Sequence, residues 1–156
     1  MAASAVQERR IVTTGPSETG DLAARLAGVA HRGDLICLVG DLGAGKTVFA
    51  KGFGRGLEVT GTITSPSFVL MAEYDGRLPL FHLDLYRLAG AAEAVTAGLL
   101  DERQGQGVTL IEWAERLAGA LPADRLDVVI DGIGDEPRTL ALRATADRYL
   151  RYLEAA

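Results

Sequence analysis

The chain has 156 residues, 48% hydrophobic and 24% charged, with a formal net charge of −5; this length suits one domain, 1–156, with its own core. The acidic balance argues against a surface that follows the phosphates of DNA, and no apolar run approaches the length of a membrane span. The N-terminus lacks the pattern of a signal peptide and a single cysteine, Cys37, excludes an internal disulfide, so we expect a soluble cytoplasmic protein.

The first half of the chain alternates short apolar runs with helical spacings. Residues 11–13 are predicted to form a strand, and Ser17 or Thr19 is expected to cap the helix that follows. The apolar run 35–39 predicts a buried strand, and a glycine-rich turn then leads into a second helix. Glycine costs a helix about 1 kcal/mol relative to alanine. We therefore expect this second helix to fray near Gly54, where glycine occupies every second position.

The second half mixes paired strands with short helices. Asp75-Gly76 lies between two apolar runs, which is a strong signal for a hairpin turn. Some strands alternate with helices and others pair through turns, so we predict an α/β fold with a mixed sheet flanked by helices. The expected strands are 68–74, 78–85, 108–111, 126–130 and 139–142, and the expected helices are 91–100, 112–121 and 145–153.

Residues 40–47 read G-D-L-G-A-G-K-T, a complete G-x-x-x-x-G-K-[ST] phosphate loop between a predicted strand and a predicted helix. The backbone N–H groups of such a loop form a concave anion site at a helix N-terminus. Lys46 is expected to reach the β- and γ-phosphates, and the Thr47 hydroxyl to ligate Mg²⁺. The residues expected to hold the phosphates are Gly40, Asp41, Leu42, Gly43, Ala44, Gly45, Lys46 and Thr47.

The nucleotide is expected to be ATP rather than GTP. GTPases read guanine with an N-K-x-D sequence, and the only other lysine of the chain, Lys51, has no aspartate two residues later. The segment 131–134 matches the D-x-x-G switch of GTPases in form, but it lies between two apolar runs and is predicted to be a turn.

Polar side chains share one face of the strand predicted at 78–85. Strand alternation places His82 and Asp84 on one side and Phe81 and Leu83 on the other. Polar groups on a buried face need hydrogen-bond partners. Two interpretations remain open: a satisfied structural network, or a wall of the nucleotide pocket in which Asp84 holds a metal-bound water or orients the attacking one.

Two further segments carry groups suited to a site for metal and phosphate. Glu112 ends an apolar run where phosphate-loop enzymes need a carboxylate for Mg²⁺, although many ordinary strands also end in glutamate. Trp113 follows it and, on sequence alone, is a helix residue packed on the core. Thr64 and Ser65 lie in a hydroxyl-rich segment that is either a switch sensing the γ-phosphate or a turn entering a strand.

Four arginines give the C-terminal part of the chain a basic character. Acidic residues, Asp147 and Glu154, lie among them, so we expect a solvated face, and nothing in the sequence supports a contact with RNA. These arginines are Arg138, Arg143, Arg148 and Arg151.

Four motifs, in this order and at these separations, resemble those of the TsaE family, also called YjeE. They are G-D-L-G-A-G-K-T at 40–47, T-S-P-S-F at 64–68, H-L-D-L-Y-R at 82–87 and I-E-W at 111–113. The resemblance covers nearly the whole chain and implies a single-domain P-loop NTPase-like fold. It also implies a bacterial, Mg²⁺-dependent ATPase with slow basal turnover. Such proteins act on the TsaB–TsaD complex, which forms threonylcarbamoyladenosine in tRNA, so they reach tRNA indirectly and are not themselves the transferase.

The resemblance also implies roles for particular residues. Ser67 stands where the family often has threonine, and the hydroxyl is retained. The segment 13–19 is expected to contribute to the adenine pocket. By position, the implied assignments are Lys46, Asp84 and Glu112 for catalysis, Thr47 and Glu112 for the metal, Thr64 and Ser65 for a switch-like segment, and Trp113 near the site.

Two other classes of function are compatible with a phosphate loop. A small P-loop kinase that phosphorylates a small-molecule acceptor would need a lid that carries several arginines. Arg103 stands nearly alone in the most suitable segment, 101–107, and the chain is short for an acceptor-binding insert. A nucleotide-binding module without useful turnover would not depend on Asp84.

Overall fold

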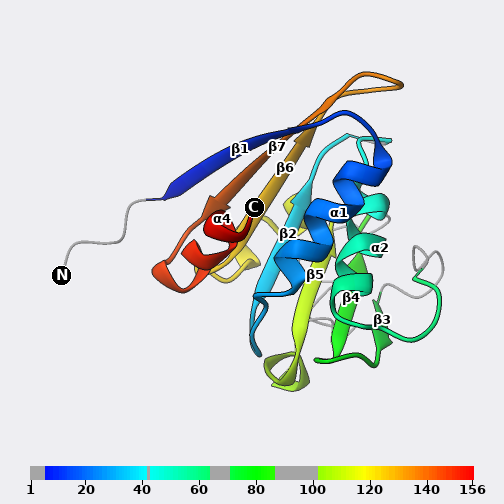
Figure 1. Ribbon diagram of the computed structural model, residues 1–156. Coiled ribbons are helices and arrows are strands. Elements are labelled where there is room, and N and C mark those ends of the chain that lie inside the picture. The colour runs from blue at the N-terminus through cyan, green and yellow to red at the C-terminus, as the bar shows by residue number, and fades with distance from the viewer. Residues whose placement is uncertain (1–5, 42, 64–70, 87–101) are drawn as a thin grey trace.

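The computed structural model describes residues 6–41, 43–63, 71–86 and 102–156. Their strands form one seven-stranded mixed sheet in the order β1-β7-β6-β2-β5-β4-β3 (Figure 1). The strands are β1 (Gln7–Thr13), β2 (Leu35–Val39), β3 (Met71–Tyr74), β4 (Leu80–Asp84), β5 (Val108–Glu112), β6 (Leu126–Asp131) and β7 (Arg138–Ala144). The helices are α1 (Pro16–Ala27), α2 (Lys46–Gly56) and α4 (Leu150–Ala155), with 3₁₀ helices η1 (Glu102–Gln106), η2 (Ala114–Ala120) and η3 (Asp147–Tyr149).

The centre of the sheet is parallel and its flanks are antiparallel. Strand β2 pairs in parallel with β5 and with β6, and β5 pairs in parallel with β4. Strands β3 and β7 run antiparallel to β4 and β6, as the predicted hairpin and the predicted closing pair require. The carboxyl ends of β2, β4 and β5 therefore meet at one edge of the sheet, which is where ligands bind in open α/β sheets.

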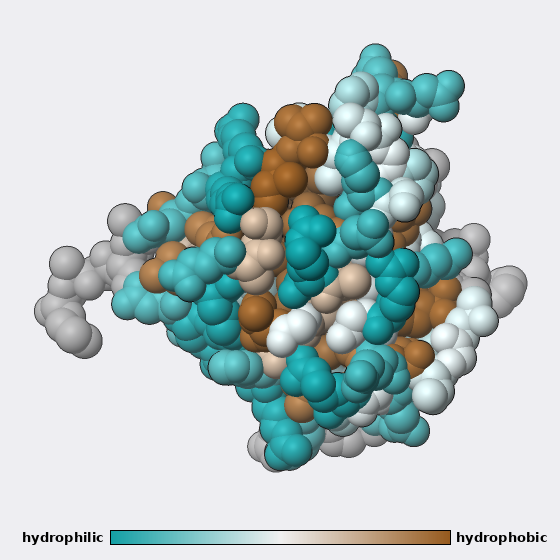
Figure 2. All heavy atoms as spheres, viewed as in Figure 1, coloured by the Kyte–Doolittle hydropathy of each residue, from teal (hydrophilic) through white to brown (hydrophobic). Residues whose placement is uncertain are grey.

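The two faces of the sheet are covered differently. Helices α1, α2 and α4 pack on one face and bury the larger core, which includes Phe49, Phe53 and Tyr152 (Figure 1). The 3₁₀ helix η2 covers part of the other face, where Leu117 packs with Cys37 and Phe81. Cys37 is buried as expected, and burial raises the pKa of its thiol to about 12. Polar side chains cover most of the visible outer surface of the helical layer, with apolar side chains between them (Figure 2).

Several predicted boundaries were wrong for identifiable reasons. Helix α1 begins at Pro16 after Gly15, with no side-chain cap, so Ser17 and Thr19 lie inside the helix; the Thr19 hydroxyl bonds to that of Thr13 at 2.7 Å. Strand β1 is longer than predicted because its residues from Gln7 onward pair with β7, although their exposed side chains show little apolar alternation. The C-terminal helix is split into η3 and α4. The helix expected at 91–100 lies outside the described residues, and no described helix is long and apolar enough to cross a membrane.

The glycines of α2 permit close packing against α1 rather than fraying, so the helix continues to Gly56. A Cβ atom on Gly52 would lie 2.3 Å from the carbonyl oxygen of Gly20, and one on Gly56 would lie 2.3 Å from that of Ala24. Both distances are far below van der Waals contact. Glycine has a low helix propensity, but these positions require it because the backbones of α1 and α2 are in contact there.

We expect Gly52→Ala to destabilise the protein by about 1–3 kcal/mol, because overpacking outweighs the gain in helix propensity. Gly20→Ala is a matched control, since a Cβ atom there meets nothing within 4 Å and should stabilise by up to about 1 kcal/mol. Urea unfolding of both variants gives the comparison. Equal stabilisation by the two substitutions would contradict the packing role of Gly52.

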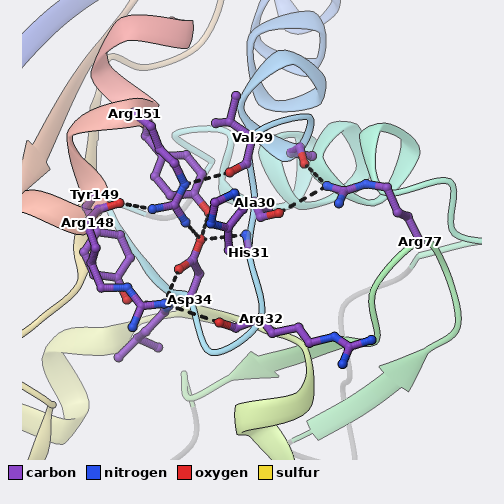
Figure 3. A network of polar contacts seen from close by, with 12 residues as sticks. Val29, Ala30, His31, Arg32, Asp34, Arg77, Arg148, Tyr149 and Arg151 are labelled. Carbon is purple, nitrogen blue, oxygen red and sulfur yellow. Dashed lines mark hydrogen bonds and ion pairs between the residues drawn. The ribbon is translucent and has the colours of Figure 1, made fainter.

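A buried carboxylate ties the C-terminus to the turn before β2 (Figure 3). Asp34 accepts hydrogen bonds from the backbone N–H of His31 at 2.9 Å, from Arg148 Nη2 at 2.8 Å and from the Tyr152 hydroxyl at 2.5 Å, and it also pairs with Arg151. Its side chain is completely buried. Arg148 and Arg151 are therefore not simply part of a solvated face, as the sequence had suggested.

The same network determines the ionisation of Asp34. Burial by itself raises the pKa of this carboxyl group, but the hydrogen bonds from Tyr152, His31 and Arg151 together outweigh it and leave the pKa below its ordinary value of 3.8. A carboxylate whose pKa is lower in the folded state than in the unfolded state stabilises the fold at pH values above the unfolded-state pKa. That contribution is lost as the pH falls through the folded-state pKa.

Tyr152→Phe should lower the free energy of unfolding at pH 7 by about 1.5–3 kcal/mol, because it removes a hydrogen bond to a charged group. The loss should shrink below about pH 4, where Asp34 becomes protonated in the unfolded chain and then in the folded one. Chemical unfolding across this pH range measures it. Tyr74→Phe removes a hydroxyl without a hydrogen bond among the described residues and serves as the control; an equal loss in both variants would contradict the role of Asp34.

Candidate functional site

The phosphate loop joins the carboxyl end of β2 to the first residue of α2, in the strand–loop–helix arrangement that the sequence predicted. Gly43 and Gly45 have positive φ angles of 81° and 113°, a backbone conformation that favours glycine. A Cβ atom on Gly40 would lie 2.7 Å from the carbonyl oxygen of Ile130, so glycine is also required where the loop passes β6. These constraints shape the loop; Leu42 lies outside the described residues.

Lys46, the first residue of α2, turns its amine back onto the loop. Its Nζ donates to the carbonyl oxygen of Gly40 at 2.5 Å and to that of Asp41 at 2.9 Å, and it lies 4.1 Å from the centre of the Trp113 ring. Burial lowers the pKa of Lys46, and the nearby carboxylates, Glu112 foremost, only partly oppose this shift. A bound phosphate would supply the compensating negative charge that the amine lacks.

Glu112 lies at the carboxyl end of β5, which pairs with β2 on one side and β4 on the other. The residue is only 2% exposed. One carboxylate oxygen, Oε1, accepts a hydrogen bond from the Thr47 hydroxyl at 3.3 Å, and the other, Oε2, lies 2.6 Å from Nε2 of His82. The structure therefore brings together Lys46, Thr47 and Glu112, which the sequence singled out separately.

Asp84 lies beside Glu112 at the end of the neighbouring strand, since the two residues are partners in the register of β4 and β5. It is partly exposed, and its Oδ1 accepts a hydrogen bond from the backbone N–H of Tyr86 at 3.0 Å. On this face of β4, His82 makes a buried polar contact with Glu112, as the structural interpretation expected. Asp84 lies close enough to Lys46 to influence its pKa, and its role toward a nucleotide stays a prediction.

Trp113 is not a helix residue, contrary to the prediction from its neighbours. It has a φ angle of 60° and lies between the end of β5 and the start of η2. Its ring contacts Lys46 on one side and Tyr86, at 5.0 Å between ring centres, on another. A positive φ angle is uncommon for a bulky residue, and such conformations cluster at functional sites. Trp113 therefore contacts the lysine of the phosphate loop and also packs on the smaller core, as the sequence suggested.

The donor groups fit a magnesium ion. Mg²⁺ is usually held by one or two protein oxygens, by waters and by the phosphates of the substrate. Thr47 and Glu112 supply two such oxygens, and no group of three or more potential ligands from His, Cys, Asp and Glu occurs in the described part of the chain. The residues thus match an ion shared with a substrate rather than a metal enclosed by protein.

A pocket of about 270 Å³ lies beside the phosphate loop. It is lined by three segments: the turn between β1 and α1, the phosphate loop with the start of α2, and the loop between β6 and β7. The first includes residues of 13–19, the segment expected to contribute to the adenine pocket. The described lining residues are Thr14, Gly15, Pro16, Thr19, Gly43, Ala44, Gly45, Val48, Gly134, Asp135, Glu136 and Arg138.

Arg138 is a residue of this region that the sequence placed on a solvated face. Its guanidinium group donates to the carbonyl oxygens of Ala44 at 3.0 Å and Gly43 at 3.3 Å, and to that of Gly134 at 2.9 Å. It thereby joins the phosphate loop to the loop between β6 and β7. The sequence signal for this loop was the predicted turn at 131–134, whose two glycines have positive φ angles.

Residues 102–107, the described part of the segment considered as a kinase lid, lie near the amino end of β2, opposite the end that carries the phosphate loop. The backbone N–H of Gly33, before β2, donates to the carbonyl oxygen of Gly107 at 2.8 Å. The phosphate loop follows β2, whose five residues span about 16 Å at about 3.3 Å each. Residues 102–107 therefore lie too far away to cover the phosphate loop. Thr64 and Ser65, the predicted switch, lie outside the described residues.

Comparison with known proteins decides the family. A sequence model of the family described as "Threonylcarbamoyl adenosine biosynthesis protein TsaE" matches residues 13–140. The chain belongs to the TsaE family. The match includes the phosphate loop, Asp84, Glu112 and Trp113, so the TsaE motifs and the geometry described above coincide.

Individual TsaE proteins are similar over most of their length. The protein from Bacillus subtilis, named tRNA threonylcarbamoyladenosine biosynthesis protein TsaE, is 45% identical over 88% of this chain and 86% of its own. The protein of the same name from Treponema pallidum is 36% identical over 85% of this chain and 98% of its own. The crystal structure of Bacillus subtilis YdiB superposes with a TM-score of 0.77 and 40% identity, covering 97% of this chain and 95% of that one.

Proposed function

We propose that this protein is a Mg²⁺-dependent ATPase with slow basal turnover that supports the formation of tRNA threonylcarbamoyladenosine by acting on the TsaB–TsaD complex. The observation that carries the proposal is the convergence of Lys46, Thr47 and Glu112 at one edge of the sheet, in a chain of the TsaE family. Its relatives are named for the same tRNA modification. The proposed ATPase would act in the cytoplasm and would reach tRNA through the TsaB–TsaD complex.

The phosphate loop and the adjoining pocket divide the binding of ATP between them. The backbone N–H groups of the loop and the amine of Lys46 would bind the phosphates. The pocket of about 270 Å³ lies directly beside Gly43–Gly45 and is built partly from 14–16, so the base and ribose would lie there. Arg138 holds both loops that line this pocket, and so it preserves the shape of the site.

Thr47 Oγ1 and Glu112 Oε1, which lie 3.3 Å apart, would hold Mg²⁺. The ion, when bound, neutralises charge that develops on the phosphates. Asp84 is the residue best placed to orient a hydrolytic water, because it ends the strand next to Glu112 and is partly open to solvent. We therefore favour hydrolysis over transfer to a second substrate, because residues 102–107, the described part of the segment considered as a lid, lie away from the phosphate loop.

Lys46→Ala should weaken the binding of Mg-ATP by about ten- to a hundredfold, because it removes a charged donor to the phosphates. Lys51→Ala is the matched control, since Lys51 is the only other lysine and its side chain is exposed on the same helix. Calorimetry measures the affinities. Trp113, the single tryptophan, should also report binding through its fluorescence as Lys46 leaves its ring. Unchanged affinity in Lys46→Ala would contradict the proposed site.

A purified TsaB–TsaD complex should bind this protein, with an affinity that depends on the nucleotide. Size-exclusion chromatography with ATP, with ADP and without nucleotide tests this, and reconstitution with TsaC and unmodified tRNA tests whether the modified base requires the protein. Absence of binding in every nucleotide state would reject the proposed role. A phosphorylated small-molecule product, detected by mass spectrometry, would favour a kinase instead.

A further inference from the structure

His82 is the most deeply buried polar residue next to the site, and no step proposed above uses it. It is 0% exposed, on the strand next to Glu112. Its Nε2 lies 2.6 Å from Oε2 of Glu112, the shortest polar contact that Glu112 makes. Its Nδ1 is buried without a hydrogen-bond partner, the one such side-chain atom among the described residues.

The sheet accounts for this contact. Strands β4 and β5 are parallel neighbours in which His82 pairs with Leu110 and Asp84 with Glu112. Side chains two residues apart on a strand share a face, so His82 and Glu112 are diagonal neighbours on the face that carries α1 and α2. Leu80 and Leu110, which flank them on that face, are completely buried in the larger core. The imidazole can reach Glu112 but is shielded from solvent.

Hydrogen-bond accounting identifies which ring nitrogen carries the proton. With a proton on Nε2 alone, His82 donates to Glu112 and leaves only a lone pair of Nδ1 without a partner. Any arrangement with a proton on Nδ1 would leave a buried N–H group unsatisfied, which costs about 1–3 kcal/mol. A proton on Nε2, with Nε2 as the donor to Glu112, is therefore favoured.

This hydrogen bond leaves the two oxygens of Glu112 with different partners. Oε2 is occupied by His82, and Oε1 faces the hydroxyl of Thr47. A carboxylate held by one oxygen cannot rotate without losing that hydrogen bond, so its second oxygen stays directed at the start of α2. Hydrogen bonds to metal-binding carboxylates generally orient them in this way.

We propose that His82 is a positioning residue that holds the carboxylate of Glu112 with Oε1 toward Thr47, and thereby makes this oxygen available to a divalent cation bound with the nucleotide. The inference rests on the proposed function, since it concerns the same Mg-ATP site. His82 touches neither nucleotide nor metal. Its effect is transmitted through Glu112, so it should appear in the metal dependence of binding rather than in nucleotide binding without metal.

Three substitutions test the geometry. His82→Gln keeps an amide donor at about the distance of Nε2, His82→Asn places its donor too close to the backbone to reach Glu112, and His82→Leu removes it. Thr109→Val, on β5, removes a buried hydroxyl from the same sheet and is the matched control. Calorimetry of each variant with ATP, with and without Mg²⁺, gives the factor by which the metal increases affinity.

We expect His82→Leu and His82→Asn to reduce this factor about tenfold or more, and His82→Gln to retain it within about threefold. Affinity for ATP without metal should change little in any variant, and Thr109→Val should match the wild type. If folded His82→Leu and His82→Asn keep the full effect of Mg²⁺, the inference is wrong while the proposed function stands. A wild-type protein that gains no affinity from Mg²⁺ would instead overturn the proposed function.

A measurement on the wild-type protein tests the inference even if the variants fail to fold. The chain has two histidines, His31 and His82, so ¹⁵N NMR of the imidazoles can be assigned with a His31→Asn variant. The spectrum should show a proton on Nε2 of His82. A proton on Nδ1 alone would leave Nε2 unable to donate to Glu112 and would overturn the inference.

Discussion

The carboxylate of Glu112 is buried at the carboxyl end of β5, between β2 and β4, and the candidate site is arranged around it. A charge removed from water must be compensated by polar contacts, or the fold loses stability. Here the compensation comes from three residues: His82 on β4, Thr47 on α2 and, through its positive charge, Lys46 at the start of α2. Two of these groups, Thr47 and Lys46, are also those that the proposed metal–phosphate site would use.

The position of α2 relative to the sheet depends on backbone contact between helices. Gly52 and Gly56 let α2 approach Gly20 and Ala24 of α1 more closely than any side chain would allow. Thr47 and Lys46 are the first residues of that helix, so its placement determines how far they lie from Glu112. The glycines lower the helix propensity of α2, and they allow the helix to pack where Thr47 reaches Glu112.

The two ends of β2 are held by different arginine contacts. At the amino end, Asp34 binds Arg148 and Arg151 from the C-terminal segment; at the carboxyl end, Arg138 binds carbonyl groups of the phosphate loop. Arg143 pairs with Glu8 at the surface. Burial and partner, rather than residue type, therefore distinguish the roles of these arginines, and the strand that presents the phosphate loop is supported at both ends.

The sequence by itself determined the features that depend on local pattern. The phosphate loop, the hairpin after Tyr74, the buried strands and the family follow from periodicity, turn chemistry and motif order, which neighbouring residues specify. Tertiary structure alone decided which distant groups meet. Four contacts join residues from separate elements: His82 with Glu112, Arg138 with the phosphate loop, Asp34 with the C-terminal segment, and the glycines of α2 with α1. These contacts depend on strand order and helix placement, so local patterns in the sequence do not predict them.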